Sequence, residues 1–265
     1  MGVISGKDLA VNGVSTVSRW KIEVPGEPAE YIASGSQSAV GRQAGIRDWR
    51  GIYTQFATQP DAWPGAALTF AGSIDESVGA SGTGIIDGVR IVWEQEKASK
   101  IRVDTFFSAN GDLTLGDAVA TDAGPPTPVT SKGKILKLDD VEVTDISEMS
   151  LYIFRRNIKY SGSSTPGYYK RVAGDWDAQV EWKQYTDTPS GLAEPFDVVA
   201  VKMYTTDTLF YLIEYVVIDL LDDFGADHMS DKPVSAHVRG SFSGFSGTAT
   251  GEITAPDSTA VWPEA

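Results

Sequence analysis

The two halves of this 265-residue sequence carry the same motifs in the same order, and this internal repeat constrains the fold more than any other feature. Each half contains, in this order, a Gly-Lys followed by alternating apolar residues, a tight-turn dipeptide, an apolar run, an Asp-Trp pair and a Phe-Ser. The matched segments are Gly6-Lys7 with Gly133-Lys134, Asn12-Gly13 with Asp139-Asp140, Trp20–Ile22 with Leu151–Ile153, Asp48-Trp49 with Asp175-Trp176, and Phe107-Ser108 with Phe242-Ser243. No single match is specific, but a shared order indicates a duplicated unit. We therefore predict two copies of one domain.

Short stretches that alternate apolar and polar residues between turn residues indicate β-strands. Over residues 101–107, Ile, Val, Thr and Phe take one side and Arg, Asp and Phe the other. Asn12-Gly13 and Asn110-Gly111 lie between such stretches and tolerate the positive φ of a two-residue hairpin turn. Residues 208–221 fit a helical stripe as well, but their aromatic and β-branched side chains favour a strand. The sequence thus predicts a mainly β fold of antiparallel β-sandwiches.

A Pro-rich stretch separates the two copies. It holds Pro125, Pro126 and Pro128 next to Gly124 and lacks aromatic residues, so it can bury little surface and its prolines keep it extended. We predict a first domain over residues 1–117, a linker over 118–131, a second domain over 132–256 and a C-terminal tail over 257–265.

Charge and composition exclude several classes of protein. The net charge of −14 argues against binding to phosphate backbones, which requires clustered Lys and Arg. The absence of cysteine excludes disulfides, thiolate zinc sites, iron–sulfur clusters and cysteine nucleophiles. No apolar run reaches the roughly 18 residues of a membrane-spanning helix, and the first residues lack the pattern of a secretory signal. We expect no membrane insertion.

A search for catalytic chemistry finds no complete set of residues. The two histidines, His228 and His237, do not share a helix face, and the sequence contains no nucleophile elbow, dinucleotide fingerprint or phosphate-binding loop. The acidic residues of 222–231 lack the EF-hand spacing. Asp48 and Asp175 are interpreted as turn caps, and the seven tryptophans as core or interface residues. We expect no enzymatic activity, no cofactor and no metal.

The opening GKDLAVNGVSTV and the closing strand pair of each half resemble the tail tube (major tail) proteins of long-tailed bacteriophages. The closing pair reads GTGIIDGVRIVWEQEKASKIRVDTFFSANGDLTLG in the first half and ends as HVRGSFSGFSGTATGEIT in the second. The resemblance covers residues 4–116 and 132–255 and extends to tube proteins with a duplicated domain. It implies a structural virion protein of a siphovirus tail. It also implies two tandem β-sandwich domains. Domains of this family usually carry a helix against the sheet, and the candidate segments here, residues 61–68 and 190–196, are short and contain proline.

The resemblance further implies a homotrimeric ring with pseudo-sixfold symmetry, stacked into a tube. Long loops would bridge adjacent rings, and by position these are residues 25–45 and 157–174. We expect their basic residues to meet acidic groups of the next ring: Arg42, Arg47, Lys159, Lys170 and Arg171. The implied partners are further copies of the chain, the tape measure protein in the lumen, and the tail terminator and baseplate proteins. The implied location is the virion tail, assembled in the host cytoplasm.

Genome DNA would pass through such a tube during ejection without binding to it. An acidic inner surface would repel phosphate groups, and we expect carboxylates to outnumber Lys and Arg there. The candidate lumen residues lie on the strands expected over 85–94 and 202–219: Asp87, Glu94, Asp207 and Glu214. Acidity on the outside of the tube, serving solubility alone, is the alternative.

Two other functions fit the same pattern of strands. One is a tandem β-sandwich binding module, such as a carbohydrate-binding or adhesin protein. The other is a different tail component of the same fold, such as a terminator or baseplate protein. Electron microscopy of the purified protein separates these hypotheses, because rings or tubes favour the tail tube and glycan-binding monomers favour the binding module.

Overall fold

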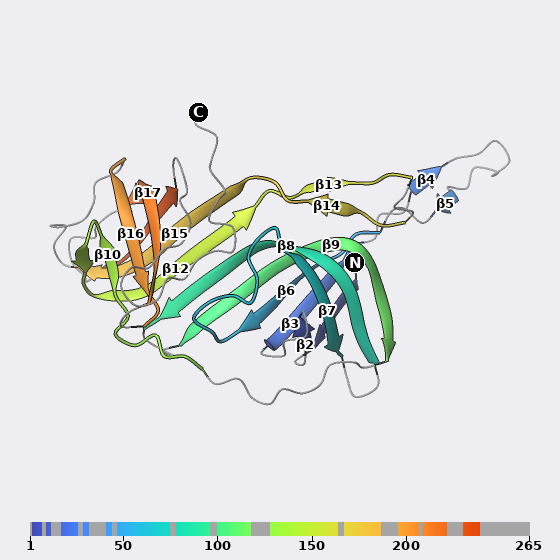
Figure 1. The fold of residues 1–265 in the computed structure, drawn as a ribbon, viewed down its shortest axis with the longest axis horizontal. Helices are drawn as coiled ribbons and strands as arrows, with labels where there is room; N and C mark the ends of the chain where they lie inside the picture. Colours follow the sequence, from blue (N-terminus) through green and yellow to red (C-terminus); the bar gives the residue numbers. More distant parts are fainter. Residues whose placement is uncertain are drawn as a thin grey trace.

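The structure of the chain is a computed structural model, and it describes residues 2–6, 9–11, 17–25, 29–31, 41–43, 47–74, 78–95, 100–117, 128–163, 167–186, 196–206, 209–221 and 230–238. Within these ranges the regular elements are all strands, and every pairing between them is antiparallel (Figure 1). The prediction of a mainly β, antiparallel fold is therefore confirmed. The strands are β1 (Gly2–Gly6), β2 (Leu9–Val11), β3 (Val17–Val24), β4 (Ala29–Tyr31), β5 (Gly41–Gln43), β6 (Arg50–Gln55), β7 (Ala67–Ser73), β8 (Val78–Glu94), β9 (Ile101–Asp117), β10 (Leu136–Leu138), β11 (Val141–Val143), β12 (Ile146–Arg155), β13 (Ile158–Tyr160), β14 (Lys170–Val172), β15 (Trp176–Thr186), β16 (Val198–Tyr204), β17 (Phe210–Leu221) and β18 (Ser230–Val238).

One 14-stranded sheet runs through both halves of the chain, in the order β1-β3-β6-β9-β8-β12-β15-β18-β17-β16-β10-β11, with β2 and β7 branching from β8. The first half contributes β3-β6-β9-β8-β7-β2, and the second half repeats this order as β12-β15-β18-β17-β16-β10. The halves meet where β8 pairs with β12, from Gly88 opposite Phe154 to Glu94 opposite Glu148. This β8–β12 junction joins two topologically equivalent units edge to edge.

Irregularities in the sheet recur at equivalent places and fix the register between the halves. The shift at Val17/Arg19 opposite Gln55/Thr54 returns at Ile146/Glu148 opposite Gln184/Lys183. The extra residue of β8 is Asp87, and its counterpart in β17 is Asp219. In this register Trp20 is equivalent to Met149, and Phe107 is equivalent to Ala236. The sequence comparison had instead matched Trp20 with Leu151 and Phe107 with Phe242, which lie two and six residues further along the chain. Repeated bulges are specific features of a fold, so the strand order and the bulges together support a duplicated unit.

A single hydrophobic core extends across both halves. In the first half, Phe70 of β7 packs against Trp49 and Phe107, with ring centroids 5.4 and 5.5 Å apart, so the branching strand covers the face of β6 and β9. Between the halves, the fully buried Tyr211 of β17 contacts Trp63 and Trp93 of the first half. The Tyr211 hydroxyl donates to the Thr58 carbonyl over 2.8 Å. The two units are therefore packed together and not merely tethered.

Several sequence expectations meet the structure at turns and connections. Asp139 and Asp140 have φ of 47° and 68°, which confirms the positive-φ hairpin turn between β10 and β11. The strand expected over 208–221 is confirmed as β17. The hairpin turn expected at Asn110-Gly111 is wrong, because β9 runs through it and only the register with β8 shifts there, between Gly82 and Gly84. Asn12-Gly13 lies outside the described residues.

The described end of the expected linker is packed against the sheet. Thr130 bridges Lys100, and the Val129 carbonyl accepts from the Ile101 amide. Ser131 is fully buried and donates to the Glu94 carbonyl. Residues 118–127 lie outside the described part. Of the two helix candidates, residues 61–68 form turns that lead into β7, and most of 190–196 lies outside the described residues.

The long connections of both halves extend from the same end of the sheet. Hairpin β13–β14 projects beyond β8 and β9, and the β4–β5 hairpin lies further out in the same direction (Figure 1). Arg47, which follows the first connection, forms a bridge with Tyr168, which lies within the second. The two segments expected to act as loops therefore meet in space.

Candidate functional site

One face of the sheet from β1 to β18 is polar and continuous across the β8–β12 junction. Strand alternation places one row of partners on this face, from Arg19 through Thr54, Asp104, Arg90 and Tyr152 to Gln179. We call it the polar face. Its described charged residues include both signs: Arg19, Lys21, Arg50, Arg90, Arg102, Lys183, Glu23, Glu94, Asp104, Glu148, Asp177 and Glu181. Neither sign predominates among them.

Ion pairs neutralise the central cations of the polar face. Arg102 contacts Glu94 at 3.3 Å and Asp104 at 3.0 Å, and Arg90 contacts Glu181 at 3.0 Å across the junction between the halves. Further along, Glu23 accepts from both Lys21 and Arg50, and these hydrogen bonds lower the pKa of Glu23. Exposed pairs such as Arg50 with Glu23 add little stability. Over the whole set the charges balance, because four cations face four carboxylates: Lys21, Arg50, Arg90 and Arg102 with Glu23, Glu94, Asp104 and Glu181.

Aromatic rings fill the polar face where the two halves meet. Tyr152 packs edge-on against Phe106 and is stacked on Phe154, with centroids 5.8 and 5.0 Å away. Gly88 makes room for this ring, because a Cβ there would lie 2.8 Å from the Tyr152 hydroxyl. Burial, reinforced by nearby Asp87, raises the pKa of Tyr152. The junction is therefore built for close packing on both faces of the sheet.

A charged cluster anchors hairpin β13–β14 to the first half. The two terminal guanidinium nitrogens of Arg171, Nη1 and Nη2, each donate to the Asp48 carboxylate at 3.0 Å, and Lys159 donates to the same carboxylate at 2.9 Å. Arg171 also donates to the Ala109 carbonyl, and its side chain is only 10% exposed. Burial of Asp48 acts to raise its pKa, but the hydrogen bonds from Arg171 and Lys159 outweigh burial and the pKa is lowered. The cluster fixes the base of the hairpin.

Asp87 lies beside this cluster, at the bulge of β8. It accepts hydrogen bonds from the Ser108 hydroxyl and from Asn157 Nδ2. Burial raises the pKa of Asp87, although these two hydrogen bonds act in the opposite direction. The residue thus links β8, β9 and the start of the β13–β14 connection.

The hairpin itself presents apolar side chains to solvent. Ile158 and Val172 are paired partners and are 64% and 54% exposed, and Tyr160 at the end of β13 is 44% exposed. Exposed apolar groups that cluster on a projecting element are typical of contact surfaces. Lys159 and Arg171 are opposite each other at the intervening position, where they bind Asp48.

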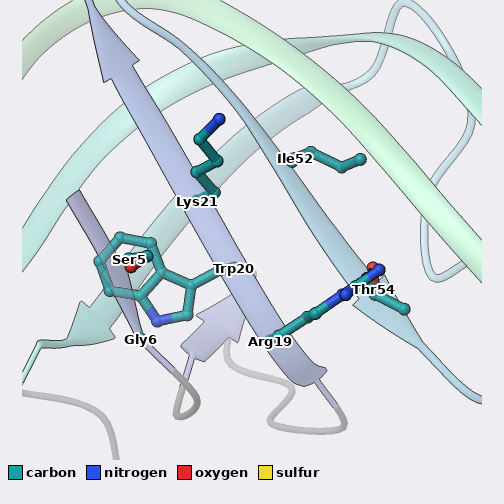
Figure 2. A pocket seen from close by; sticks show the side chains of 7 residues that line it. All are labelled: Ser5, Gly6, Arg19, Trp20, Lys21, Ile52 and Thr54. Atoms are coloured by element: carbon teal, nitrogen blue, oxygen red, sulfur yellow. Dashed lines mark hydrogen bonds between the residues drawn. The ribbon is translucent and has the colours of Figure 1, made fainter. Parts of the chain in front are cut away.

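A pocket of about 540 Å³ opens at the outer edge of β3, where β1 ends. Figure 2 shows Arg19 directed toward Thr54, to which its Nε donates over 3.3 Å, and the indole of Trp20 lying toward Ser5 and Gly6. A smaller hollow of about 280 Å³ continues along Glu23, Arg50 and Phe106. The larger hollow lies over β1, β3 and β6, and the smaller over β3, β6 and β9.

The structure brings together some of the sequence-predicted site residues and separates others. Lys159, Lys170 and Arg171 share one hairpin, with Arg47 next to its tip at Tyr168. Glu94 lies on the polar face, and Asp87 lies at the bulge beside Asn157. Arg42 is in β5 and Glu214 in β17, but only their backbones are described, and Asp207 lies outside the described residues.

For Asp48 the sequence predicted the turn cap but not its cationic partners, and for the tryptophans it predicted the buried position. Asp48 caps the turn as expected, since Oδ1 accepts from the Trp49 amide, but its two cationic partners come from the other half and leave no local signal. The six tryptophans within the described ranges are all buried, which confirms the core interpretation. No metal-binding group of His, Cys, Asp or Glu occurs among the described residues.

Neither a scan of family models nor a search among curated proteins finds a match to this sequence. Among the residues that the structure describes, there is no helix with the length and apolar character needed to cross a membrane.

Proposed function

We propose that this chain is a structural subunit of a tube, of the duplicated tail tube type, in which three copies close a ring and rings stack. In this proposal each half is one tube-like β-sandwich unit, and the ring is held by sheet pairing between successive units. The observation that carries the proposal is the β8–β12 junction, where two equivalent units are already joined edge to edge within one chain.

The geometry of the junction supports propagation around a ring. An edge strand is a template for further pairing, and a unit that joins its own copy through defined edges can join the next chain in the same way. A heterologous contact of this kind closes a ring when the rotation per unit divides a full turn. Six units from three chains would satisfy this condition.

The polar face is the surface that we assign to the lumen. Its Lys and Arg side chains that lie in ion pairs offer little free charge to phosphate groups, so DNA would gain few counterion-releasing contacts there. Neutralisation of the paired cations would act in the same direction as the expected excess of carboxylates, since both keep phosphate groups from binding. Hairpin β13–β14, with exposed Ile158 and Val172, is assigned to the seam between rings.

Negative-stain electron microscopy with symmetry classification tests this function directly. We expect rings with threefold symmetry at low protein concentration and stacked tubes at higher concentration. Rings of six whole chains would contradict the proposed role of the duplication. A protein that stays monomeric at every concentration, particularly one that binds glycans, would favour the binding-module alternative.

A further inference from the structure

Hairpin β4–β5 of the first half is the counterpart of hairpin β13–β14 of the second half. In β13–β14, Lys159 lies opposite Arg171, and in β4–β5, Glu30 lies opposite Arg42. The shift in numbering between these two pairs is the one that relates β3 to β12 in the sheet. Arg42 therefore occupies in the first hairpin the position that Arg171 occupies in the second. Both hairpins keep the arginine, whereas the residue opposite it is a lysine in one and a glutamate in the other.

The acceptor of this arginine also has a counterpart in the second unit. The same shift in numbering relates Asp48 to Asp177. In each unit, Oδ1 of the aspartate accepts from the amide of the next residue, from Trp49 at 3.0 Å and from Ala178 at 2.9 Å. Asp177 is thus the structural equivalent of Asp48, in place of Asp175, which the sequence comparison had matched with it.

We propose that Arg42 binds Asp177 of a second copy of this chain, in the way that Arg171 binds Asp48 within one chain. This inference rests on the proposed function, in which successive units meet through equivalent surfaces, and it names one contact between neighbouring chains of a ring. β1 pairs with β3 only as far as Val24, and hairpin β4–β5 begins beyond that residue, so β1 pairs with no part of the hairpin.

The first line of evidence is that Asp177 is less occupied than Asp48. Among the described residues, Asp177 forms its ion pair with Arg156 at 3.8 Å, and the side chain of this arginine is 79% exposed. Asp48, by contrast, binds two cations of the other half at 2.9 and 3.0 Å. The Asp177 side chain is 31% exposed, compared with 18% for Asp48. The carboxylate of Asp177 is therefore accessible to a guanidinium from another copy.

The second line of evidence is that the charges on the two sides change together. The described cations that bind Asp48 both belong to the other unit, whereas Asp177 has Arg156 of its own unit beside it. The hairpin that would approach Asp177 carries Glu30 opposite Arg42, in place of two cations. Two charges of each sign would then meet between the copies, and this complementarity favours the correct partner and register.

The third line of evidence is a surface that is covered in one unit and open in the other. The Gly65 amide donates to the Ile86 carbonyl, and the Phe196 amide donates to the Ile218 carbonyl, so Gly65 and Phe196 are equivalent. A Cβ at Gly65 would lie 2.7 Å from Arg155, which precedes hairpin β13–β14. Phe196 is 81% exposed. The place that the base of one hairpin takes beside the first unit is therefore free beside the second.

Charge reversal tests the contact in sedimentation and electron microscopy. Arg42→Glu or Asp177→Lys alone should raise the protein concentration needed for ring formation by about tenfold or more, because a charge-assisted hydrogen bond becomes a repulsion. Added salt should reduce this deficit. The two changes together should restore assembly, because every contact then carries the reversed pair. The matched controls, Lys132→Glu and Glu142→Lys, make the same changes of charge at exposed positions outside both hairpins and should assemble like the parent.

A neutral pair of variants covers the case in which a reversed charge impairs folding, which urea unfolding of each monomer detects. Arg42→Gln and Asp177→Asn should each weaken ring formation, and asparagine keeps an oxygen for the Ala178 amide. Both changes together should cost no more than either alone, because they remove the same contact. Losses that simply add in the double variant would overturn the inference.

The outcomes separate this inference from the proposed function. If the single reversals form rings at the concentration of the parent, or if the double reversal is as impaired as the singles, the contact is refuted and the tube proposal survives. Normal rings that no longer stack would place Arg42 at the seam between rings, as the sequence predicted, and would also overturn the inference. If the parent itself never assembles, the proposed function fails and the inference fails with it.

Discussion

Asp48 forms the ion pairs that anchor hairpin β13–β14 of the second half to the first half. Its carboxylate accepts from Arg171 and Lys159, both more than a hundred positions away in the sequence, and these bonds lower its pKa below the ordinary value of 3.8. A group with a lowered pKa in the folded state stabilises the fold fully above its unfolded pKa. This contribution is lost as the pH falls through the folded-state pKa.

Asp48→Asn should therefore destabilise the protein at neutral pH by about 1–3 kcal/mol, the usual loss for charge-assisted hydrogen bonds. The difference between parent and variant should shrink as the pH falls below about 4, where the carboxylate becomes protonated in the unfolded chain, and it should be lost as the pH falls through the lower pKa of the folded state. Urea unfolding at a series of pH values measures this difference. A gap between the two proteins that is constant from pH 7 to pH 3 would show that the ion pairs with Asp48 contribute nothing.

Phe196 is 81% exposed and has a positive φ of 72°, so we expect it to contribute to contacts in the assembly and not to the stability of the monomer. Phe196→Gly relieves the positive φ but adds the flexibility of glycine to the unfolded chain, so the stability of the monomer should change by less than about 1 kcal/mol. If Phe196 contacts a neighbouring copy in the proposed ring, its loss should raise the protein concentration needed for ring formation by about tenfold or more. Leu115→Ala, which removes another exposed apolar side chain, is the control for sedimentation measurements. Equal assembly of Phe196→Gly and the parent would remove Phe196 from the interface.

Among the elements, hairpin β13–β14 is held by charges at its base and is exposed along its apolar side. The sequence indicated that this connection is functional because of its length and its basic residues, but it could not show that Arg171 is occupied by Asp48 within the chain. Nor could it show the apolar row, because Ile158 and Val172 become neighbours only when the hairpin closes. The strands, and the turn at Asp139-Asp140, follow from local patterns of residues, whereas these contacts depend on tertiary pairing.

Serine at both Ile158 and Val172 should leave rings intact and weaken their stacking into tubes. The side chains are more than half exposed, so folding stability should change by no more than about 0.5 kcal/mol per site. Electron microscopy of the double variant measures the ratio of rings to tubes. Val141→Ser, at an exposed residue of β11, provides the control. Tubes of normal length from the double variant would show that the seam lies elsewhere.

The role of the polar face can be tested by removing carboxylates that pair with its cations and measuring the binding of DNA. Glu94→Gln together with Glu181→Gln removes the carboxylate that pairs with Arg90 and one of the two that pair with Arg102, which keeps Asp104. We expect assembled rings of this variant to retain double-stranded oligonucleotides at low salt and to release them as salt rises, while the parent retains none. Glu142→Gln, on exposed β11, changes the net charge without touching this face. Similar retention by both variants would show that net charge, and not the polar face, controls binding.

At the level of the whole molecule, the sequence showed the internal repeat but not the hydrophobic core that its two copies share. The order of motifs predicted two units, and the strand order agrees with it. The sequence predicted two domains joined by an extended linker. In the structure, Tyr211 of the second unit is buried against Trp63 and Trp93 of the first. Sequence periodicity shows which face of a strand is buried but not which strand covers it. The shared core thus had to come from the structure.

The shared core predicts that the two units unfold together. Differential scanning calorimetry of the parent should show one transition whose van't Hoff and calorimetric enthalpies agree, because neither unit keeps a complete core without the other. Trp93→Ala removes a fully buried side chain from this core and should cost about 3–5 kcal/mol, lowering the single transition without splitting it. Val199→Ala, in a strand of the second unit where the side chain is 7% exposed, should shift the same transition by less, because a smaller side chain is removed. Two separate transitions in the parent, or a Trp93→Ala protein in which half of the unfolding enthalpy stays at the original temperature, would show that the units are energetically independent.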